Sequence, residues 1–243
     1  MGFLRATQPR TPHSRRTFLQ HAAVWTAAAG GLRAQPSSGK GRLLAYVGAI
    51  TDTHSGKGIY TFEVNTATGA LTPITAYESG DQNPSWLAFH PDKTHLYAAN
   101  SGKEGSLSSF SIDPATGALE LLNTEKAHGS GSTHCSLHPS GKWIFVANYG
   151  SGNAAVLPVK PDGTLGEATD VVEIPVNPPA LGKQPAIDAP TGSFAISGHD
   201  SAHAHQIACD PAGAYVFLTD LGTDRTWVYK FDATNGKLTP NTP

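Results

Sequence analysis

The chain has 243 residues, a formal net charge of −2 and only 15% charged residues. This sparsely charged, near-neutral composition disfavours a nucleic-acid partner and a partner at an anionic membrane surface. The length suits a single domain, and the 26 glycines and 18 prolines are typical of a turn-rich all-β protein.

Residues 1–34 have the features of an export signal. Ser14-Arg15-Arg16-Thr17-Phe18-Leu19 is a twin-arginine pattern, and an apolar run at 22–29 and small residues up to Ala34 follow it. The alternative is a chance basic pair before a short helix. We expect twin-arginine export, cleavage near Ala34, a linker at 35–42, and a periplasmic or secreted protein. The run is shorter than the ~20 apolar residues of a membrane span, so no membrane association is expected after cleavage.

From residue 43 onward a short phrase recurs. Its copies open with His90-Pro91, His138-Pro139 and Asp210-Pro211, and each ends an apolar stretch on Asn100, Asn148 or Asp220. The first two copies are 48 residues apart at both landmarks and the last two are 72 apart at both, so one insertion separates the later pair. A period of ~40–50 residues points to a propeller or a solenoid.

Each repeat holds four short stretches suited to β-strands, which turn residues separate. In the second repeat these stretches are 85–89, 95–100, 107–112 and 119–123. Outside the N-terminal segment no stretch has the apolar spacing of an amphipathic helix. Four strands per repeat predict an all-β β-propeller of four-stranded antiparallel blades. The predicted blades are about 43–76, 84–124, 132–170 and 203–240, with an insertion at 171–202.

The first repeat has stretches that match the second, third and fourth strands of the others, but none that matches the first strand. Propellers often begin within a blade and take the missing strand from the C-terminal end, whereas this chain ends at Pro243, just after the fourth repeat. We therefore expect residues 43–243 to be a partial β-propeller, the N-terminal part of a longer one. A complete four-bladed ring with an incomplete first blade is the alternative.

The first strand of each full repeat is expected to run beside the central axis. Leu87 and Phe89 have apolar counterparts in the other two repeats, as a strand buried between stacked sheets requires. Ser85, Thr133 and His205 are assigned to the other, polar side, which would face the channel. Cys135 and Cys209 fall on the apolar side and are interpreted as small core residues, with a disulfide left open.

The repeats resemble the lactonase-type seven-bladed propellers, the family of the bacterial propeller 6-phosphogluconolactonases and the fungal muconate-lactonising enzymes. The resemblance covers about residues 43–240 and implies seven blades, of which about four are present here. Its departures are Ala49-Ile50, where the family often has Thr-Tyr, and the Pro-rich segment 175–200. The segments that carry it are 46–48, 58–62, 90–100, 146–153, His203-Ala204-His205 and Asp220-Leu221-Gly222-Thr223-Asp224-Arg225.

The resemblance implies hydrolysis of a sugar lactone to the open acid. That reaction needs a group that delivers water to the carbonyl and a donor that holds the developing oxyanion. The histidine of the family's proposed catalytic set matches His205, whereas its arginine and glutamate correspond to positions beyond Pro243. Ser85, Thr133 and His203 are expected at the substrate, with a loop contact as the alternative for His203. The alternative function is a non-catalytic secreted propeller that binds a protein or a carbohydrate at its channel face.

Other polar residues are assigned structural roles. The cluster of His199, Asp200, His203 and His205 has metal-ligand residue types but no zinc-motif spacing, so neither a metal nor a cofactor is expected. The recurring His90 and His138, and the strand-end residues Asn100, Asn148 and Asp220, are assigned to turns. We expect a monomer when the protein is full length, with a small sugar lactone as its partner.

Overall fold

The computed structural model describes residues 41–51, 56–175, 198 and 200–241. The predicted leader and most of the predicted linker and insertion lie outside these ranges. Every regular element within them is a β-strand, which confirms the all-β prediction. Among these residues no helix has the length and apolarity needed to cross a membrane.

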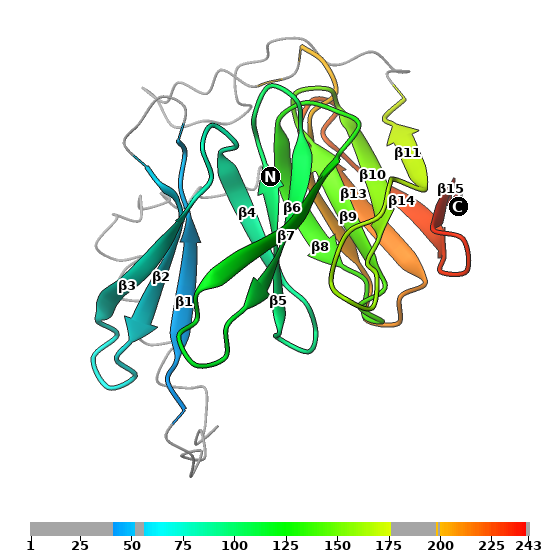
Figure 1. Cartoon of the computed structure of the whole chain (residues 1–243). Helices are drawn as coiled ribbons and strands as arrows, with labels where there is room; N and C mark the ends of the chain where they lie inside the picture. The colour runs from blue at the N-terminus through cyan, green and yellow to red at the C-terminus, as the bar shows by residue number, and fades with distance from the viewer. Residues whose placement is uncertain (1–40, 52–55, 176–197, 199, 242–243) are drawn as a thin grey trace, which may run out of the picture. The chain divides into compact units, whose positions relative to one another are not determined.

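The strands form four antiparallel sheets that follow one another in chain order (Figure 1). The first sheet has three strands, as expected for a repeat that lacks its first strand: β1 (Leu44–Gly48), β2 (Gly58–Val64) and β3 (Leu71–Glu78). The second sheet has four: β4 (Pro84–Phe89), β5 (His95–Asn100), β6 (Ser106–Ile112) and β7 (Leu119–Lys126). The third has β8 (Ser132–Leu137), β9 (Trp143–Asn148), β10 (Asn153–Pro158) and β11 (Asp170–Glu173). The fourth has β12 (Ala204–Cys209), β13 (Tyr215–Asp220), β14 (Arg225–Asp232) and β15 (Lys237–Pro240).

The hydrophobic core lies between successive sheets. Strand β5 shows why, because its side chains alternate between two faces and are buried on both. Leu96 and Ala98 pack against Ile59 of the first sheet, whereas Tyr97 and Ala99 pack in a cluster with Ile144 of the third. A third cluster joins the third and fourth sheets in the same way. Four meandering sheets stacked face to face are the blades of a β-propeller.

The repeated His-Pro turns connect neighbouring blades. The His90 Nε2 atom lies 3.2 Å from the carbonyl oxygen of Gly141, and the His138 Nε2 atom lies 3.1 Å from that of Gly213. A carbonyl oxygen only accepts, so each Nε2 atom carries a proton and donates it. Each glycine has a positive φ, 72° and 78°, and a Cβ atom there would lie 2.4 or 2.3 Å from the histidine Nε2 atom. We call each pair a His–Gly latch, which extends the turn role predicted for these histidines to the next blade.

The first strands of the full blades, β4, β8 and β12, lie next to one another. Each contains a register shift at the same place, which leaves Ser85, Thr133 and His205 as the extra residues of three equivalent β-bulges. The prediction put Ser85, Thr133 and His205 on the side opposite Leu87 but did not include these bulges. A strict two-residue period would put Ser85 on the same face as Leu87, and the bulge releases it from that face.

The last strand of the third blade differs from the predicted blade boundary, and the structure shows the state of the two cysteines. The last strand of the third blade, β11, occupies 170–173, beyond the predicted end of that blade at about 170. Leu165 makes only an isolated bridge to Val159, next to Pro158, which has no N–H group for a continuous ladder. Both cysteines are free thiols, Cys135 buried and Cys209 half-buried.

Candidate functional site

The three bulge residues have different surroundings. Ser85 Oγ donates to the carbonyl oxygens of Ala99 and Ser132, at 3.2 and 2.9 Å, and Thr133 Oγ1 donates to that of Gly131 at 2.9 Å. These two hydroxyl groups are thus held by backbone, and Ser85 also connects its blade to the next. His205 is exposed, and its ring meets the edge of the Tyr149 ring at 5.9 Å between centroids. A bulge often redirects a side chain beside an active site, and here that side chain is an exposed imidazole.

Two pairs of aromatic and imidazole rings lie on neighbouring blades. Trp86 lies 4.4 Å from His134, and Tyr149 stacks on His203 at 4.4 Å with an angle of 15° between the planes. His205 contacts Tyr149 and lies near enough to His134 for its charge to act on that ring. We call this set the imidazole row: Trp86, His134, His205, Tyr149 and His203.

His134 is the buried member of the row. Its side chain is 7% exposed, and its Nδ1 atom accepts a hydrogen bond from the backbone N–H of Ile207 at 3.4 Å. Burial, with a smaller contribution from the charge of His205, lowers the pKa of His134 to about 4. His134 is therefore neutral near pH 7, and the bond at Nδ1 leaves the proton on Nε2.

His203 is held by its neighbours. Its Nδ1 atom lies 2.9 Å from the Tyr149 carbonyl oxygen, and its Nε2 atom lies 3.2 Å from Asp200 Oδ1. Its backbone N–H donates to Oδ1 of the buried Asp220 at 2.7 Å. Both ring nitrogens thus have protein partners, and the substrate contact expected of His203 stays a prediction. His199, the other histidine of the predicted cluster, lies outside the described residues.

His205 lines a hollow of about 460 Å³ on the fourth blade. The other residues that line it are Thr219, Asp220, Leu221, Asp224, Arg225 and Thr226. Arg225 enters this hollow because it is the first residue of β14 and pairs in register with Asp220. The sequence alone did not indicate that Arg225 shares this hollow with His205 or that Tyr149 contacts His205. Predicting that Arg225 lies in this hollow would have required the pairing of β14 with β13, which sets Arg225 opposite Asp220.

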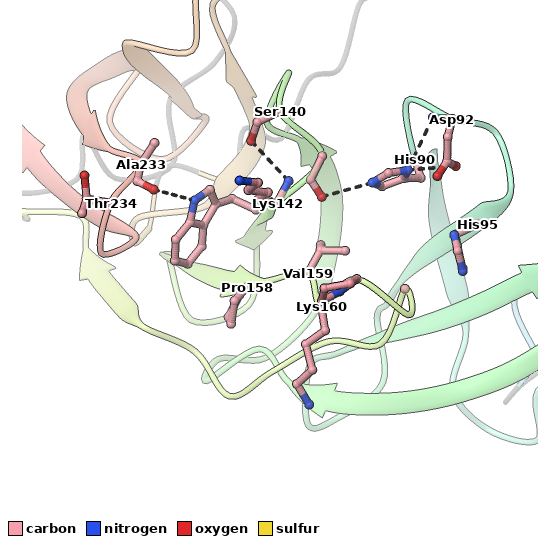
Figure 2. Close-up of a pocket in the computed structure, with 14 residues that line it drawn as sticks. His90, Asp92, His95, Ser140, Lys142, Pro158, Val159, Lys160, Ala233 and Thr234 are labelled. Atoms are coloured by element: carbon pink, nitrogen blue, oxygen red, sulfur yellow. Dashed lines mark hydrogen bonds and ion pairs between the residues drawn. The ribbon is translucent and has the colours of Figure 1, made fainter.

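This arrangement combines the groups that acyl chemistry needs. The exposed imidazole of His205 can accept and return a proton, and the Arg225 guanidinium can stabilise an oxyanion. The Trp86 side chain, 45% exposed, offers an apolar ring to the face of a sugar. A separate cleft of about 570 Å³ lies beside the His-Pro turns, past the other end of β4, between His90 and Ala233 (Figure 2).

Comparison with known proteins agrees with this fold. The family model described as "Lactonase, 7-bladed beta-propeller" matches residues 44–243. An uncharacterized protein of Staphylococcus epidermidis is 36% identical over 189 residues, which are 77% of this chain and 50% of that protein. The chain thus spans about half the length of the curated relatives it matches.

Solved structures show the same similarity. A candidate 6-phosphogluconolactonase of Bacteroides fragilis is 32% identical, with a TM-score of 0.65 over 84% of this chain and 54% of that one. The periplasmic gluconolactonase of Pseudomonas aeruginosa is 29% identical, with a TM-score of 0.65 over 83% of this chain and 56% of that one. Blade architecture, family match and structural similarity agree, and the chain belongs to the lactonase family of seven-bladed β-propellers.

Proposed function

We propose that the protein hydrolyses a sugar lactone to the open aldonic acid, with His205 as the group that moves the proton. The observation that carries this proposal is the exposed imidazole at a β-bulge of an inner strand, in one hollow with a guanidinium. Membership of the lactonase family supports the reaction type, and the similar Pseudomonas protein is a gluconolactonase.

In the proposed reaction, His205 takes a proton from water as the water oxygen attacks the lactone carbonyl carbon. The carbonyl oxygen becomes an oxyanion, which the Arg225 guanidinium stabilises. Collapse of this intermediate breaks the bond between the carbonyl carbon and the ring oxygen. The ring oxygen leaves with the proton from His205, and the product is the hydroxy acid. Ser85 and Thr133 border the site through the backbone they hold.

The charges in the hollow favour an unphosphorylated lactone. Asp220 and Asp224 line it together with a single guanidinium, that of Arg225. Two negative charges disfavour a phosphate group in the hollow, although the buried Asp220 already accepts from the His203 and Gly222 N–H groups and from Thr223. A periplasmic or secreted location, proposed from Arg15 and Arg16, agrees, and the similar Pseudomonas gluconolactonase is periplasmic. Replacement of both arginines by lysine tests this location, since it should keep the protein in the cytoplasm.

The decisive experiment completes the propeller, because the chain spans about half of its relatives. We would extend residue 243 with the corresponding C-terminal half of the Pseudomonas gluconolactonase and measure acid release from gluconolactone, corrected for spontaneous opening. The extended protein should hydrolyse the lactone, and His205→Asn should lower the rate by about 100-fold or more. His128→Asn, which removes an exposed histidine on another loop, should not change it.

Two results would refute this proposal. One is an extended protein that melts cooperatively yet opens the lactone no faster than buffer does. The other is a His205→Asn variant as active as its parent. Binding of gluconolactone without hydrolysis would favour the second candidate, a non-catalytic carbohydrate-binding propeller, for which the exposed Trp86 ring beside His134 is the supporting observation. The 243-residue chain alone should show little activity, and we propose that the complete protein is a monomer.

A further inference from the structure

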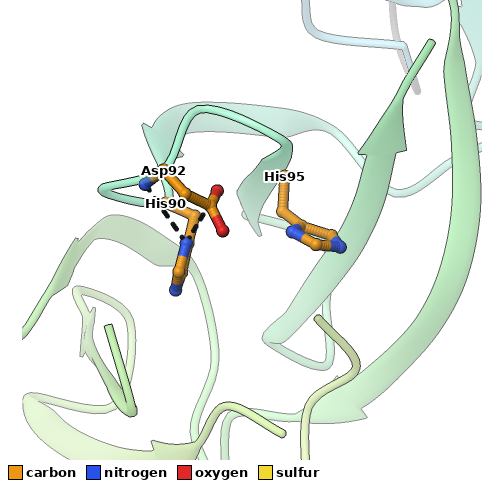
Figure 3. A group of neighbouring side chains, drawn as sticks. All are labelled: His90, Asp92 and His95. Atoms are coloured by element: carbon orange, nitrogen blue, oxygen red, sulfur yellow. Dashed lines mark hydrogen bonds and ion pairs between the residues drawn. The ribbon is translucent and has the colours of Figure 1, made fainter. Parts of the chain in front are cut away.

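The turn between β4 and β5 gathers three metal-ligating side chains away from the imidazole row. One ligand atom from each of His90, Asp92 and His95 lies within 4.8 Å of the other two. Figure 3 shows the Asp92 carboxylate between the two imidazole rings. The group is half-exposed and lines the 570 Å³ cleft, so an ion can reach it from solvent.

The His–Gly latch determines which nitrogen of His90 points to this group. Because Nε2 donates its proton to the Gly141 carbonyl, Nδ1 of the neutral ring is an acceptor, and the Asp92 backbone N–H approaches it at 3.4 Å. That Nδ1 atom lies 2.9 Å from Asp92 Oδ1, which is also an acceptor. Two acceptors this close repel each other, and the Asp92 N–H contact of 3.4 Å is longer than a usual hydrogen bond. A metal ion bound to both atoms would remove this repulsion.

The other blades show that the turn does not require this arrangement. In the third blade the equivalent residues are His138, Ser140 and Trp143, and the Ser140 hydroxyl satisfies His138 Nδ1 at 2.8 Å without a cation. In the fourth blade they are the non-ligating Ala212 and Tyr215 after Asp210, which caps its own turn. Among the described full blades, only the second has a carboxylate and two imidazoles at the turn between its first and second strands.

We propose that His90, Asp92 and His95 bind a divalent transition-metal ion of the zinc type. Two imidazoles and one carboxylate are a common zinc ligand set, in which a fourth position is open to water. Ligand atoms around a tetrahedral zinc ion lie roughly 3.3 Å apart, so the three ligand atoms, which lie within 4.8 Å of one another, would move closer together on binding. The open position faces the cleft, which Lys142 and Lys160 also line (Figure 2).

The surroundings of the triad resemble the outer shell of a metal site. Ligating histidines commonly donate their second N–H group to a backbone carbonyl, as His90 does to Gly141. Thr94 Oγ1 lies 2.8 Å from both Asp92 Oδ1 and His95 Nδ1 and so orients both. The ion would join the turn of the second blade to the third blade through the latch. It would act on stability, independently of the proposed lactone hydrolysis.

The experiment uses the 243-residue chain freed of metal with a chelator. Zinc affinity is measured by competition with a chromogenic chelator, and the visible spectrum of added Co²⁺ reports tetrahedral coordination. Asp92→Asn keeps the acceptor for the Thr94 N–H group but removes the charge, and His95→Gln removes one imidazole. His90 stays unchanged in both variants, so the latch is preserved. His128→Asn is the control for the loss of a histidine elsewhere.

The unmodified chain and the His128→Asn control should bind one zinc equivalent at this site, and zinc should raise their melting temperature. Asp92→Asn and His95→Gln should each weaken this binding by more than about 100-fold, since loss of a direct ligand costs more than loss of an outer partner. Unchanged zinc binding in both variants would overturn the proposal. Absence of binding to the unmodified chain would overturn it too.

Discussion

At the scale of single residues, the candidate site depends on the contrast between two neighbouring histidines. His205 is exposed at a bulge, whereas His134 is buried between Trp86 and the backbone of Ile207. Sequence could suggest His205, because it follows a family pattern in a strand. It could not suggest His134, because burial and ring contacts come from blades that are distant in the chain.

The lowered pKa of His134 predicts a pH-dependent stability. In the unfolded chain this histidine takes up a proton below its ordinary pKa of 6.5, whereas in the folded chain it does so only near 4. The unfolded state therefore binds more protons between these values, and stability falls as the pH drops from about 6.5 to about 4. His134→Gln should remove a part of this loss on the order of 1–2 kcal/mol, after allowance for solvent screening.

Urea unfolding at a series of pH values measures this effect, with His128→Asn as the control for removal of an exposed histidine. The groups near His134 are Trp86, His205 and the Ile207 N–H group. The His134→Gln variant removes the buried titrating group and leaves these neighbours unchanged. Equal pH profiles for His134→Gln and the unmodified chain between pH 4.5 and 6.5 would contradict the prediction.

At the scale of elements, the turns between blades were predictable as turns but not as connections. The His-Pro phrase indicated a tight turn, and the structure adds that the histidine reaches the next blade. The inner strands were predictable from their apolar residues, but the bulge was not, because an extra residue leaves no mark on a two-residue period until the partner strand is known. The position of Ser85, Thr133 and His205 therefore needed the register.

The His–Gly latch predicts unequal costs for two glycine replacements with the same backbone conformation. Gly213 has φ +78° with His138 Nε2 at 2.3 Å from a new Cβ atom, whereas Gly69 has φ +75° with nothing within 4 Å. Gly69→Ala should lower the unfolding free energy by about 1 kcal/mol, the cost of the left-handed backbone. Gly213→Ala should cost about 1–3 kcal/mol more, because it displaces a buried hydrogen bond.

Chemical denaturation of both variants measures the two costs under the same conditions. The difference between them isolates the contact with His138, since the backbone strain is common to both. A Gly213→Ala variant that is no less stable than Gly69→Ala would show that the latch contributes nothing to stability.

At the scale of the whole molecule, the repeat predicted the blades because each blade repeats one pattern of apolar strands and turn residues. Which face of the fourth blade is exposed was less predictable from the sequence. In β13 the residues that face the third blade, such as Val216 and Leu218, are buried. Tyr215 and Phe217 point the other way and are 39% and 41% exposed. A sequence pattern alone cannot tell a strand covered on both faces from one covered on a single face.

One face of the fourth blade is covered by none of the described residues, and it predicts self-association of the 243-residue chain. Contiguous exposed apolar side chains on a sheet are a docking surface, and Phe217 lies next to Val228 of β14 on that face. Sedimentation velocity should show association that grows with concentration, and Phe217→Lys should shift the chain toward monomer. Leu121→Lys changes a residue of similar exposure, 39%, on the outer strand β7 of another blade, and should not. A chain that stays monomeric at every concentration would contradict the prediction, and equal effects of the two variants would assign the association to a different surface.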